Sequence, residues 1–221
     1  MTSEAVKACA LGAGASVAGI AAAEAFTSAP EGFKPEDAFP GCRSVIVLGA
    51  PMPKEAIQGE DTTGFIDIRN EVNAKLSETA KAIVKLLKAE KHKAKAISGM
   101  SGKYVDGFTH GPISLKHAAE LAGLGVIGRN YLLINREYGT LLWLNAVLTD
   151  AELTPDERLQ FSVCENCNIC AEACPVGALD MPGAVNKKGC SGHMFKMIDK
   201  KWEIVCFQCR KRCPYWEGCS A

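Results

Sequence analysis

The chain carries no surplus of charge of either sign, and this balance already excludes one class of protein. Its 221 residues include 25 Lys or Arg and 25 Asp or Glu. A protein dedicated to nucleic-acid binding usually carries a basic surplus, so we do not expect a nucleic-acid partner. With 48% hydrophobic residues, the chain is apolar enough to bury a core, which excludes a disordered or collagen-like protein.

Long hydrophobic runs are also lacking. Residues 8–23 carry no charge, but this run is mostly Ala and Gly and is too short to span a bilayer. Glu4 offsets Lys7 before this run, so the basic start of an export signal is missing, as is a twin-arginine pair. We therefore expect a buried helix and strand here, no membrane span and a cytoplasmic protein.

Cysteine is scarce in most of the chain and abundant at its end. Only Cys9 and Cys42 precede residue 161, whereas the segment from residue 161 to the C-terminus holds all the other cysteines. A disulfide scaffold is typical of a short secreted chain, while spacings of two and three residues are typical of metal ligands. We expect Cys9 and Cys42 to be small buried hydrophobes, and Cys219 not to be a ligand.

Apolar patterning predicts helices and strands as far as about residue 150. The predicted helices cover residues 3–12, 67–91 and 113–122, and the predicted strands cover residues 16–21, 43–49, 93–98 and 140–149. Residues 99–112 are predicted to form a loop, and residues 123–130 (GLGVIGRN) a glycine-rich turn. Because the elements follow no regular βαβ order, we expect an α+β domain over residues 1–160 and a second domain over residues 161–221.

The second domain, named the cysteine-rich module below, has the cysteine spacing of a bacterial ferredoxin. Cys164-x2-Cys167-x2-Cys170-x3-Cys174-Pro175 is the ferredoxin run, whose fourth cysteine binds the other cluster in two-cluster ferredoxins. A partial second run and an isolated cysteine follow. The spacing predicts two [4Fe–4S] clusters, one held by Cys164, Cys167, Cys170 and Cys213, the other by Cys174, Cys190, Cys206 and Cys209.

Two questions stay open in this module. Its CxxC pairs are also compatible with structural zinc, although three evenly spaced cysteines followed by Cys-Pro are more specific for iron–sulfur clusters. The module carries eight Lys or Arg against six Asp or Glu. This basic surplus either steers an acidic electron donor, such as a ferredoxin or flavodoxin, or offsets the charge of the clusters.

One long segment carries a family resemblance. Residues 117–150, HAAELAGLGVIGRNYLLINREYGTLLWLNAVLTD, followed by the two cysteine runs, resemble epoxyqueuosine reductase and its relatives. The same superfamily holds the corrinoid-dependent reductive dehalogenases. GAGASVAGIAAAEAF and PEDAFPGCRSVIVLGAPMP, both near the N-terminus, resemble the start of short stand-alone members. The strongest parts of the resemblance are AGLGVIGRN, EYGT and the cysteines.

The resemblance implies a nitroreductase-like N-terminal domain that carries a corrinoid, with a ferredoxin-like module packed against it. FMN is a weaker alternative to the corrinoid, because the nitroreductase-like fold also suits that cofactor. The function implied is an iron–sulfur reductase of anaerobic metabolism, which passes low-potential electrons to a small-molecule substrate. A homodimer is compatible with this assignment. The alternatives are an electron-transfer protein that activates a partner, such as a corrinoid protein, and a structural relic.

The sequence departs from the family in two places. It shows no helical-repeat extension of the kind that family members use to hold tRNA, so we expect a substrate other than tRNA. In the family an Asp closely precedes a proline that opens the helix before AGLG and supplies a proton. Here that proline is Pro112, and the candidate proton donors are Asp106 and His110.

The remaining candidates are cofactor-binding residues. Tyr104 and Arg129 are predicted to touch the substrate or cofactor, and His117 either to face the pocket or to form a surface pair with Glu120. Gly123, Gly125 and Gly128 follow a helix and not a strand, which is the wrong context for a dinucleotide-binding turn. We expect them to allow a close approach of the backbone to a cofactor or to a neighbouring segment.

Overall fold

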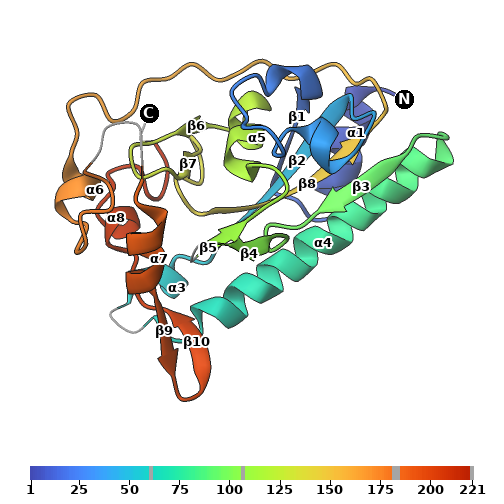
Figure 1. The fold of residues 1–221 in the computed structure, drawn as a ribbon. Coiled ribbons are helices and arrows are strands. Elements are labelled where there is room, and N and C mark those ends of the chain that lie inside the picture. The colour runs from blue at the N-terminus through green and yellow to red at the C-terminus, as the bar shows by residue number, and fades with distance from the viewer. Residues whose placement is uncertain (60–61, 106–107, 181–184, 220–221) are drawn as a thin grey trace.

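The computed structural model describes residues 1–59, 62–105, 108–180 and 185–219 (Figure 1). Its helices are α1 Ser3–Gly12, η1 Ala23–Ala25, α2 Pro35–Ala38, α3 Glu55–Gln58, α4 Phe65–Ala89, α5 Leu115–Leu121, α6 Ile169–Glu172, α7 Lys187–Met194 and α8 Gln208–Lys211. Its strands are β1 Val17–Ala22, β2 Ser44–Pro51, β3 Ala94–Ile97, β4 Lys103–Val105, β5 Phe108–His110, β6 Val126–Ile127, β7 Leu133–Ile134, β8 Leu142–Thr149, β9 Phe195–Ile198 and β10 Lys201–Ile204.

A four-stranded antiparallel sheet forms the centre of the N-terminal part. The strand order is β1-β2-β8-β3, and each of the three pairings is antiparallel. Strands far apart in the sequence therefore lie side by side, as β2 does with β8. This mixed architecture fits the α+β expectation, while the nitroreductase-like assignment stays a prediction.

Both faces of this sheet are covered. Val45 and Val47 of β2 point to a core completed by α5, whereas Ile46 and Leu48 point to a core completed by α1 and α4. All four side chains are fully buried. Burial on both faces explains why the strands are continuously apolar and do not alternate with polar residues. In Figure 1, α4 runs diagonally along one side of the sheet and α5 lies on the other.

Helix α4 confirms the helix predicted from the apolar spacing. Each of its ends lies two residues before the predicted one. Its buried side chains share one face, since those from Leu76 onwards include residues three and four apart. These residues are Phe65, Leu76, Thr79, Ala80, Ile83 and Leu87. Apart from the burial of Thr79, this face confirms the predicted amphipathic pattern. No helix among the described residues has both the length and the apolar composition needed to cross a bilayer.

The prediction of a continuous loop over residues 99–112 was wrong. A small antiparallel hairpin, β4–β5, lies there, with Lys103 opposite His110. In a second unpredicted pair, β6–β7, the first strand lies within the glycine-rich turn and the second follows it. These strands are only two or three residues long, too short to show the period of two by which strands are recognised in a sequence.

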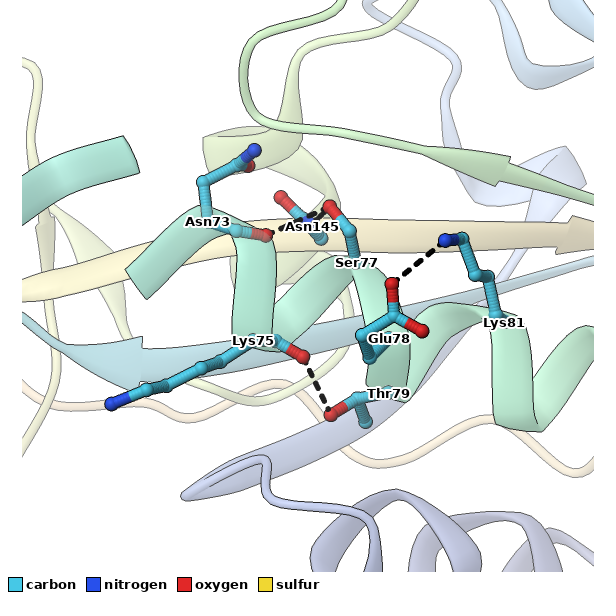
Figure 2. Close-up of polar contacts among 7 residues, drawn as sticks. All are labelled: Asn73, Lys75, Ser77, Glu78, Thr79, Lys81 and Asn145. Carbon is cyan, nitrogen blue, oxygen red and sulfur yellow. Dashed lines mark hydrogen bonds and ion pairs between the residues drawn. The ribbon is translucent and has the colours of Figure 1, made fainter. Parts of the chain in front are cut away.

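A polar network buried between α4 and β8 holds the segment that leads into the β4–β5 hairpin. Asn145 of β8 is fully buried; its side chain donates to Ser77 Oγ (3.3 Å) and accepts from the Gly99 N–H (2.6 Å). Asn73 of α4 accepts from Ser98 Oγ at 2.9 Å. Figure 2 shows Asn73, Ser77 and Asn145 lying together between the helix and the strand. The network therefore fixes residues 98–99, and with them the start of the hairpin that carries the candidate His110.

The cysteine-rich module shares a core with the N-terminal part. Phe65 and Phe207 stack at a tilt, with ring centroids 4.5 Å apart. The shared cluster of buried side chains contains Met52, Ile57, Phe65, Leu141, Ile204 and Phe207. Aromatic and aliphatic contacts of this kind fix the relative position of the two parts.

The connection to the module is an extended segment. Residues 152–164 have no regular secondary structure and run along the upper edge of the molecule in Figure 1. Asp156 fastens this segment to the N-terminal part, since it accepts hydrogen bonds from Lys7 Nζ (2.5 Å) and the Ile20 N–H (2.9 Å). The predicted domain boundary at residues 160–161 falls within this segment.

Replacing Asn145 with leucine should destabilise the protein by about 1–3 kcal/mol, because the Gly99 N–H and Ser77 lose their buried partner. Asn70→Leu is the matched control: Asn70 lies on the exposed face of α4, where the same change should alter stability by less than about 0.5 kcal/mol. Urea unfolding followed by circular dichroism measures both. Equal midpoints for the two variants would contradict a structural role for the network.

Candidate iron–sulfur site

The module presents its cysteines from two short helices and the turns around them. Helix α6 carries Cys170 and is followed by Cys174, and helix α8 carries Cys209 and is followed by Cys213. The two helices pack against each other. Cys164 adopts a positive φ of 64°, which turns the chain sharply at the start of the first run. The repeated arrangement brings thiols that are distant in the sequence to one place.

A first group of thiols combines the start of the first run with the end of the second. Burial, and after it the negative charge of Cys164 and Cys167, raises the pKa of Cys170. Burial also raises the pKa of Cys213, on which the same two thiols and Cys170 act. Cys213 therefore lies beside the other three, although it belongs to the second cysteine run.

A second group combines the remaining thiols. Burial, followed by the charges of Cys174 and Cys206, raises the pKa of Cys190. The pKa of Cys209 rises to about 11, chiefly through burial and despite the neighbouring Arg210, with Cys190 and Cys206 adding to the rise. Cys170 also acts on Cys209, so the two groups adjoin each other.

The two groups have the composition of the predicted ligand sets. This observation rests on the proximity of the thiols, so the ligand sets themselves stay a proposal. The donor chemistry fits iron–sulfur clusters: ionised thiols in a half-buried group repel one another, and bound metal relieves this repulsion and keeps them ionised. Among the residues that the structure describes, no three His, Cys, Asp or Glu side chains converge as ligands of one metal ion.

Backbone N–H groups point at two of the thiols. The Arg129 N–H donates to Cys164 Sγ at 3.4 Å, and the Ala178 N–H donates to Cys174 Sγ at 3.2 Å. Hydrogen bonds to cluster sulfurs stabilise added negative charge and thereby raise reduction potentials. One such bond reaches each group.

The remaining cysteines lie apart from these groups. Cys42 is buried in the core, and burial raises its pKa to about 11. Cys9, on α1, is partly buried and packs against the core. The backbone of Cys219 donates to the Arg136 carbonyl at 2.8 Å. These positions agree with the expectation that Cys9 and Cys42 are packing residues.

The glycine-rich turn contacts the cysteine-rich module, a role that sequence analysis missed. Besides its bond to Cys164, Arg129 donates from its guanidinium to the Asn168 side chain. Asn130 Nδ2 donates to the Cys209 carbonyl at 3.2 Å. Consecutive residues of AGLGVIGRN thus hold one loop from each group of thiols.

The EYGT segment forms a second contact with the module. Gly139 has a φ of 52°, and a Cβ there would lie 2.3 Å from the Tyr215 carbonyl oxygen. The Thr140 N–H donates to the Trp216 carbonyl at 3.1 Å. Only glycine combines this conformation with so close an approach. The two segments that carry the family resemblance most strongly therefore both join the N-terminal part to the module.

Lys116 of α5 lies at the same junction, next to the second group. Its ammonium donates to the Tyr131 carbonyl. Its pKa is lowered to about 8, chiefly by burial and in part by Lys187 and Arg210, against the opposing charges of Cys190 and Cys209. No sequence signal singled out this residue, because a lysine on a helix normally lies on its solvated face.

The candidate catalytic residues lie on different elements. Asp106 lies outside the described residues. His110 ends β5, with its ring centroid 5.9 Å from that of Phe33. Strand β5 also packs against α7, the helix that carries Cys190. His110 is therefore on the strand that faces the second group of thiols.

Apart from Tyr104, the candidate cofactor residues contact neighbouring parts of the chain. Tyr104 is 74% exposed. His117 Nδ1 lies 2.8 Å from Ser114 Oγ at the exposed start of α5. Gly123 has a φ of 69° and passes the Glu157 carbonyl so closely that a Cβ would lie 2.3 Å from its oxygen. Gly125 and Gly128 likewise pack against Ile134. The glycines thus approach neighbouring segments of the chain, and their role towards a cofactor stays a prediction.

A hollow of about 450 Å³ lies elsewhere, at the EYGT contact. It is lined by Arg136, Glu137, Pro214, Trp216, Glu217, Gly218 and Cys219. Of the predicted cofactor and catalytic residues that the structure describes, none borders it.

The 4Fe-4S binding domain family matches residues 159–180, which include the first cysteine run. Over 199 residues the chain is 28% identical to the epoxyqueuosine reductase of Gloeobacter violaceus, covering 81% of this chain and 58% of that protein. Because a relative of this chain carries this name, the expectation of a substrate other than tRNA is not supported.

Solved structures extend the similarity to the fold. A crystal structure of epoxyqueuosine reductase with an epoxyqueuosine-modified tRNA stem loop has a TM-score of 0.69 at 20% identity, covering 97% of this chain and 65% of that chain. A catabolic reductive dehalogenase has a TM-score of 0.72 at 18% identity, covering 97% of this chain and 32% of that one. The chain thus spans less than two thirds of each of these proteins. It is similar in sequence to epoxyqueuosine reductases and shares its fold with both epoxyqueuosine reductases and reductive dehalogenases, with a 4Fe-4S binding region at residues 159–180.

Proposed function

We propose that this protein is an iron–sulfur oxidoreductase that passes low-potential electrons through two [4Fe–4S] clusters to a second cofactor and a small-molecule substrate in the N-terminal domain. The observation that carries the proposal is the gathering of eight thiols into two adjoining groups, the second of which meets α5 and β5. The clusters supply one-electron transfer. The side chains and backbone of this chain position the cysteine loops, supply positive charge and exclude water at the junction.

These residues perform three tasks. Arg129 and Asn130 hold the two cysteine loops at a fixed position against the N-terminal part. Lys116 places a positive charge beside Cys190 and Cys209, where it favours the addition of an electron. The shared core around Phe65 and Phe207 excludes water from one side of the junction.

The second cofactor in this proposal is a corrinoid, with FMN as the weaker alternative. The hydroxyls of Tyr131 and Thr140 are buried and have no hydrogen-bond partner among the described residues. Both lie on the segments that form the junction, where a bound polar group would satisfy them. Reductive dehalogenases, whose fold this chain shares, include one described as B12-dependent.

Proton delivery is assigned to the β4–β5 hairpin. His110 ends the strand that packs against α7, and an imidazole transfers protons readily near neutral pH. Asp106, four residues earlier in the sequence, is the other candidate.

Reduction of epoxyqueuosine is the second candidate activity. The relative from Gloeobacter violaceus carries that name and aligns with 81% of this chain. Incubating the reduced protein with epoxyqueuosine-containing tRNA, followed by nucleoside analysis, distinguishes this substrate from a small molecule.

The cofactor content of anaerobically purified protein, produced with cobalamin in the medium, tests the proposal directly. We expect about eight irons and eight sulfides per chain, as two [4Fe–4S] clusters require, together with one cobalt or one flavin. Elemental analysis and absorption spectra measure all four. The same iron with neither cobalt nor flavin would contradict a second cofactor and favour the electron-transfer protein.

Single cysteine variants test the ligand sets. Cys190→Ala and Cys206→Ala should each lose about half of the iron, because both residues are proposed ligands of the second cluster. In both variants only the electron paramagnetic resonance signal of the first cluster should remain. Cys213→Ala should leave the other signal. Cys9→Ala, a cysteine outside both groups, is the control and should keep all the iron. Unchanged iron in Cys190→Ala would refute the assignment.

Lys116 tests the electrostatics of the second group. Lys116→Met removes a positive charge next to these thiols, so the reduction potential of the second cluster should fall by an amount on the order of tens of millivolts, with little change in the first. Redox titration followed by electron paramagnetic resonance measures both potentials.

Lys116→Arg, which keeps the charge, should restore the potential, and Lys75→Met on the exposed face of α4 should have no effect. Equal potentials in Lys116→Met and the unmodified protein would show that Lys116 acts only through packing.

A further inference from the structure

The β9–β10 hairpin stands out from the module in Figure 1, below α7. Its two strands pair in a regular antiparallel register, with Trp202 opposite Met197 and Ile204 opposite Phe195. Asp199 and Lys200 form the turn with positive φ values of 46° and 65°, the conformation of a tight two-residue hairpin turn. The hairpin therefore presents its side chains in a defined order.

An apolar stripe runs along one face of this hairpin. Side chains on a strand alternate between faces, so the two cross-strand pairs share one face. At the base of the hairpin, Ile204 is buried in the shared core and Phe195 packs against it. At the outer end, Trp202 is 59% exposed and Met197 is 55% exposed. The stripe thus leaves the core and continues into solvent.

The hairpin is inserted between two cysteines of the second group. Cys190 lies on the helix that precedes β9, and Cys206 follows β10 by two residues. Trp202 lies four residues before Cys206. Even a fully extended chain spans at most about 14 Å over that distance. A protein that contacts Trp202 is therefore held close to the second group of thiols.

The charges around the stripe are mainly positive. Residues 185–219 contain eight Lys or Arg against three Asp or Glu. Some of these cations are engaged inside the protein: Lys211 donates to the Gly59 carbonyl, and burial lowers the pKa of Arg210 to about 10. Lys200 and Lys201 are exposed at the outer end of the hairpin, where Lys201 precedes Trp202 and lies on the opposite face of the strand. An acidic surface complements this end of the hairpin.

We propose that the outer end of the β9–β10 hairpin is the docking surface for an acidic electron-donor protein of the flavodoxin or ferredoxin class. The inference rests on the proposed function as an iron–sulfur oxidoreductase. Trp202 and Met197 form the apolar contact, and Lys200 and Lys201 orient the donor. In the transfer, the donor is oxidised by one electron and this protein is reduced by one; no bond forms or breaks.

A second copy of this chain is a less suitable occupant. A symmetric dimer built on Trp202 brings the same patch of both copies together. Lys200 and Lys201 of one copy would then face those of the other, and like charges at an interface are unfavourable. An acidic partner meets the same apolar surface without this repulsion.

The experiment uses cluster-loaded protein under anaerobic conditions, with purified flavodoxin and a [2Fe–2S] ferredoxin as probes. Calorimetry measures binding and stopped-flow absorption measures electron transfer, each at low and high salt. The variants are Trp202→Ala and the double variant Lys200→Glu/Lys201→Glu. Their controls are Leu11→Ala, an exposed apolar side chain on α1, and Lys75→Glu/Lys85→Glu on the exposed face of α4, which changes the net charge equally.

We expect Trp202→Ala to weaken binding of at least one probe about tenfold. The lysine variant should slow association about tenfold at low salt, with a smaller effect at high salt. Both controls should behave like the unmodified protein. Iron content and reduction by dithionite should be unchanged in every variant.

Three results would overturn the docking surface while leaving the proposed function intact: cluster-loaded protein that binds neither probe at low salt, hairpin variants that accept electrons as fast as the controls, or a dimer that dissociates in Trp202→Ala. Loss of the proposed function is a separate outcome, because it would appear as protein without iron before any probe is added.

Discussion

Burial of the thiols of the module, to which their mutual repulsion adds, is the constraint on which the arrangement of this protein depends. Each group combines cysteines from both runs of the module, and the charge of Cys170 in the first group acts on Cys209 in the second. Ionised thiols in such a space need bound metal and nearby positive groups. Arg210 lies next to Cys209, and the Arg129 N–H points at Cys164. The N-terminal part supplies Arg129 and Lys116, so it contributes directly to the electrostatics of the module.

The same contacts explain why the two parts of the chain form one unit. AGLGVIGRN and EYGT carry the family resemblance, and each donates a hydrogen bond to a backbone carbonyl of the module. The Asn130 side chain donates to the Cys209 carbonyl, and the Thr140 N–H donates to the Trp216 carbonyl. Gly139 could not be replaced without moving the segment after Cys213, because a Cβ would meet the Tyr215 carbonyl oxygen. A segment that positions two cysteine loops is constrained in sequence even where it binds no cofactor itself.

Sequence analysis could predict the elements whose signal is local. The apolar period of α4 and the continuous apolar run of β2 report burial directly, and the cysteine spacing reports thiols that share one turn. The β4–β5 hairpin is too short to show a period. The role of Lys116 depends on Cys190 and Cys209, which lie far along the chain in the other domain, and no local pattern encodes such a contact. The three glycines of the turn were recognised as sites of close approach, but their spacing does not show that the neighbours are Glu157 and Ile134.

The projecting hairpin follows from the position of the cysteines. The chain leaves the second group after Cys190 and must return to it at Cys206. Two antiparallel strands and a tight turn satisfy most backbone hydrogen bonds over that path, but their outer end extends beyond the core that buries Ile204. A segment needed only to connect these two cysteines would be served best by polar residues at its exposed end. Trp202 and Met197, with Lys200 and Lys201 at the same end of the hairpin, are the residues of a contact surface.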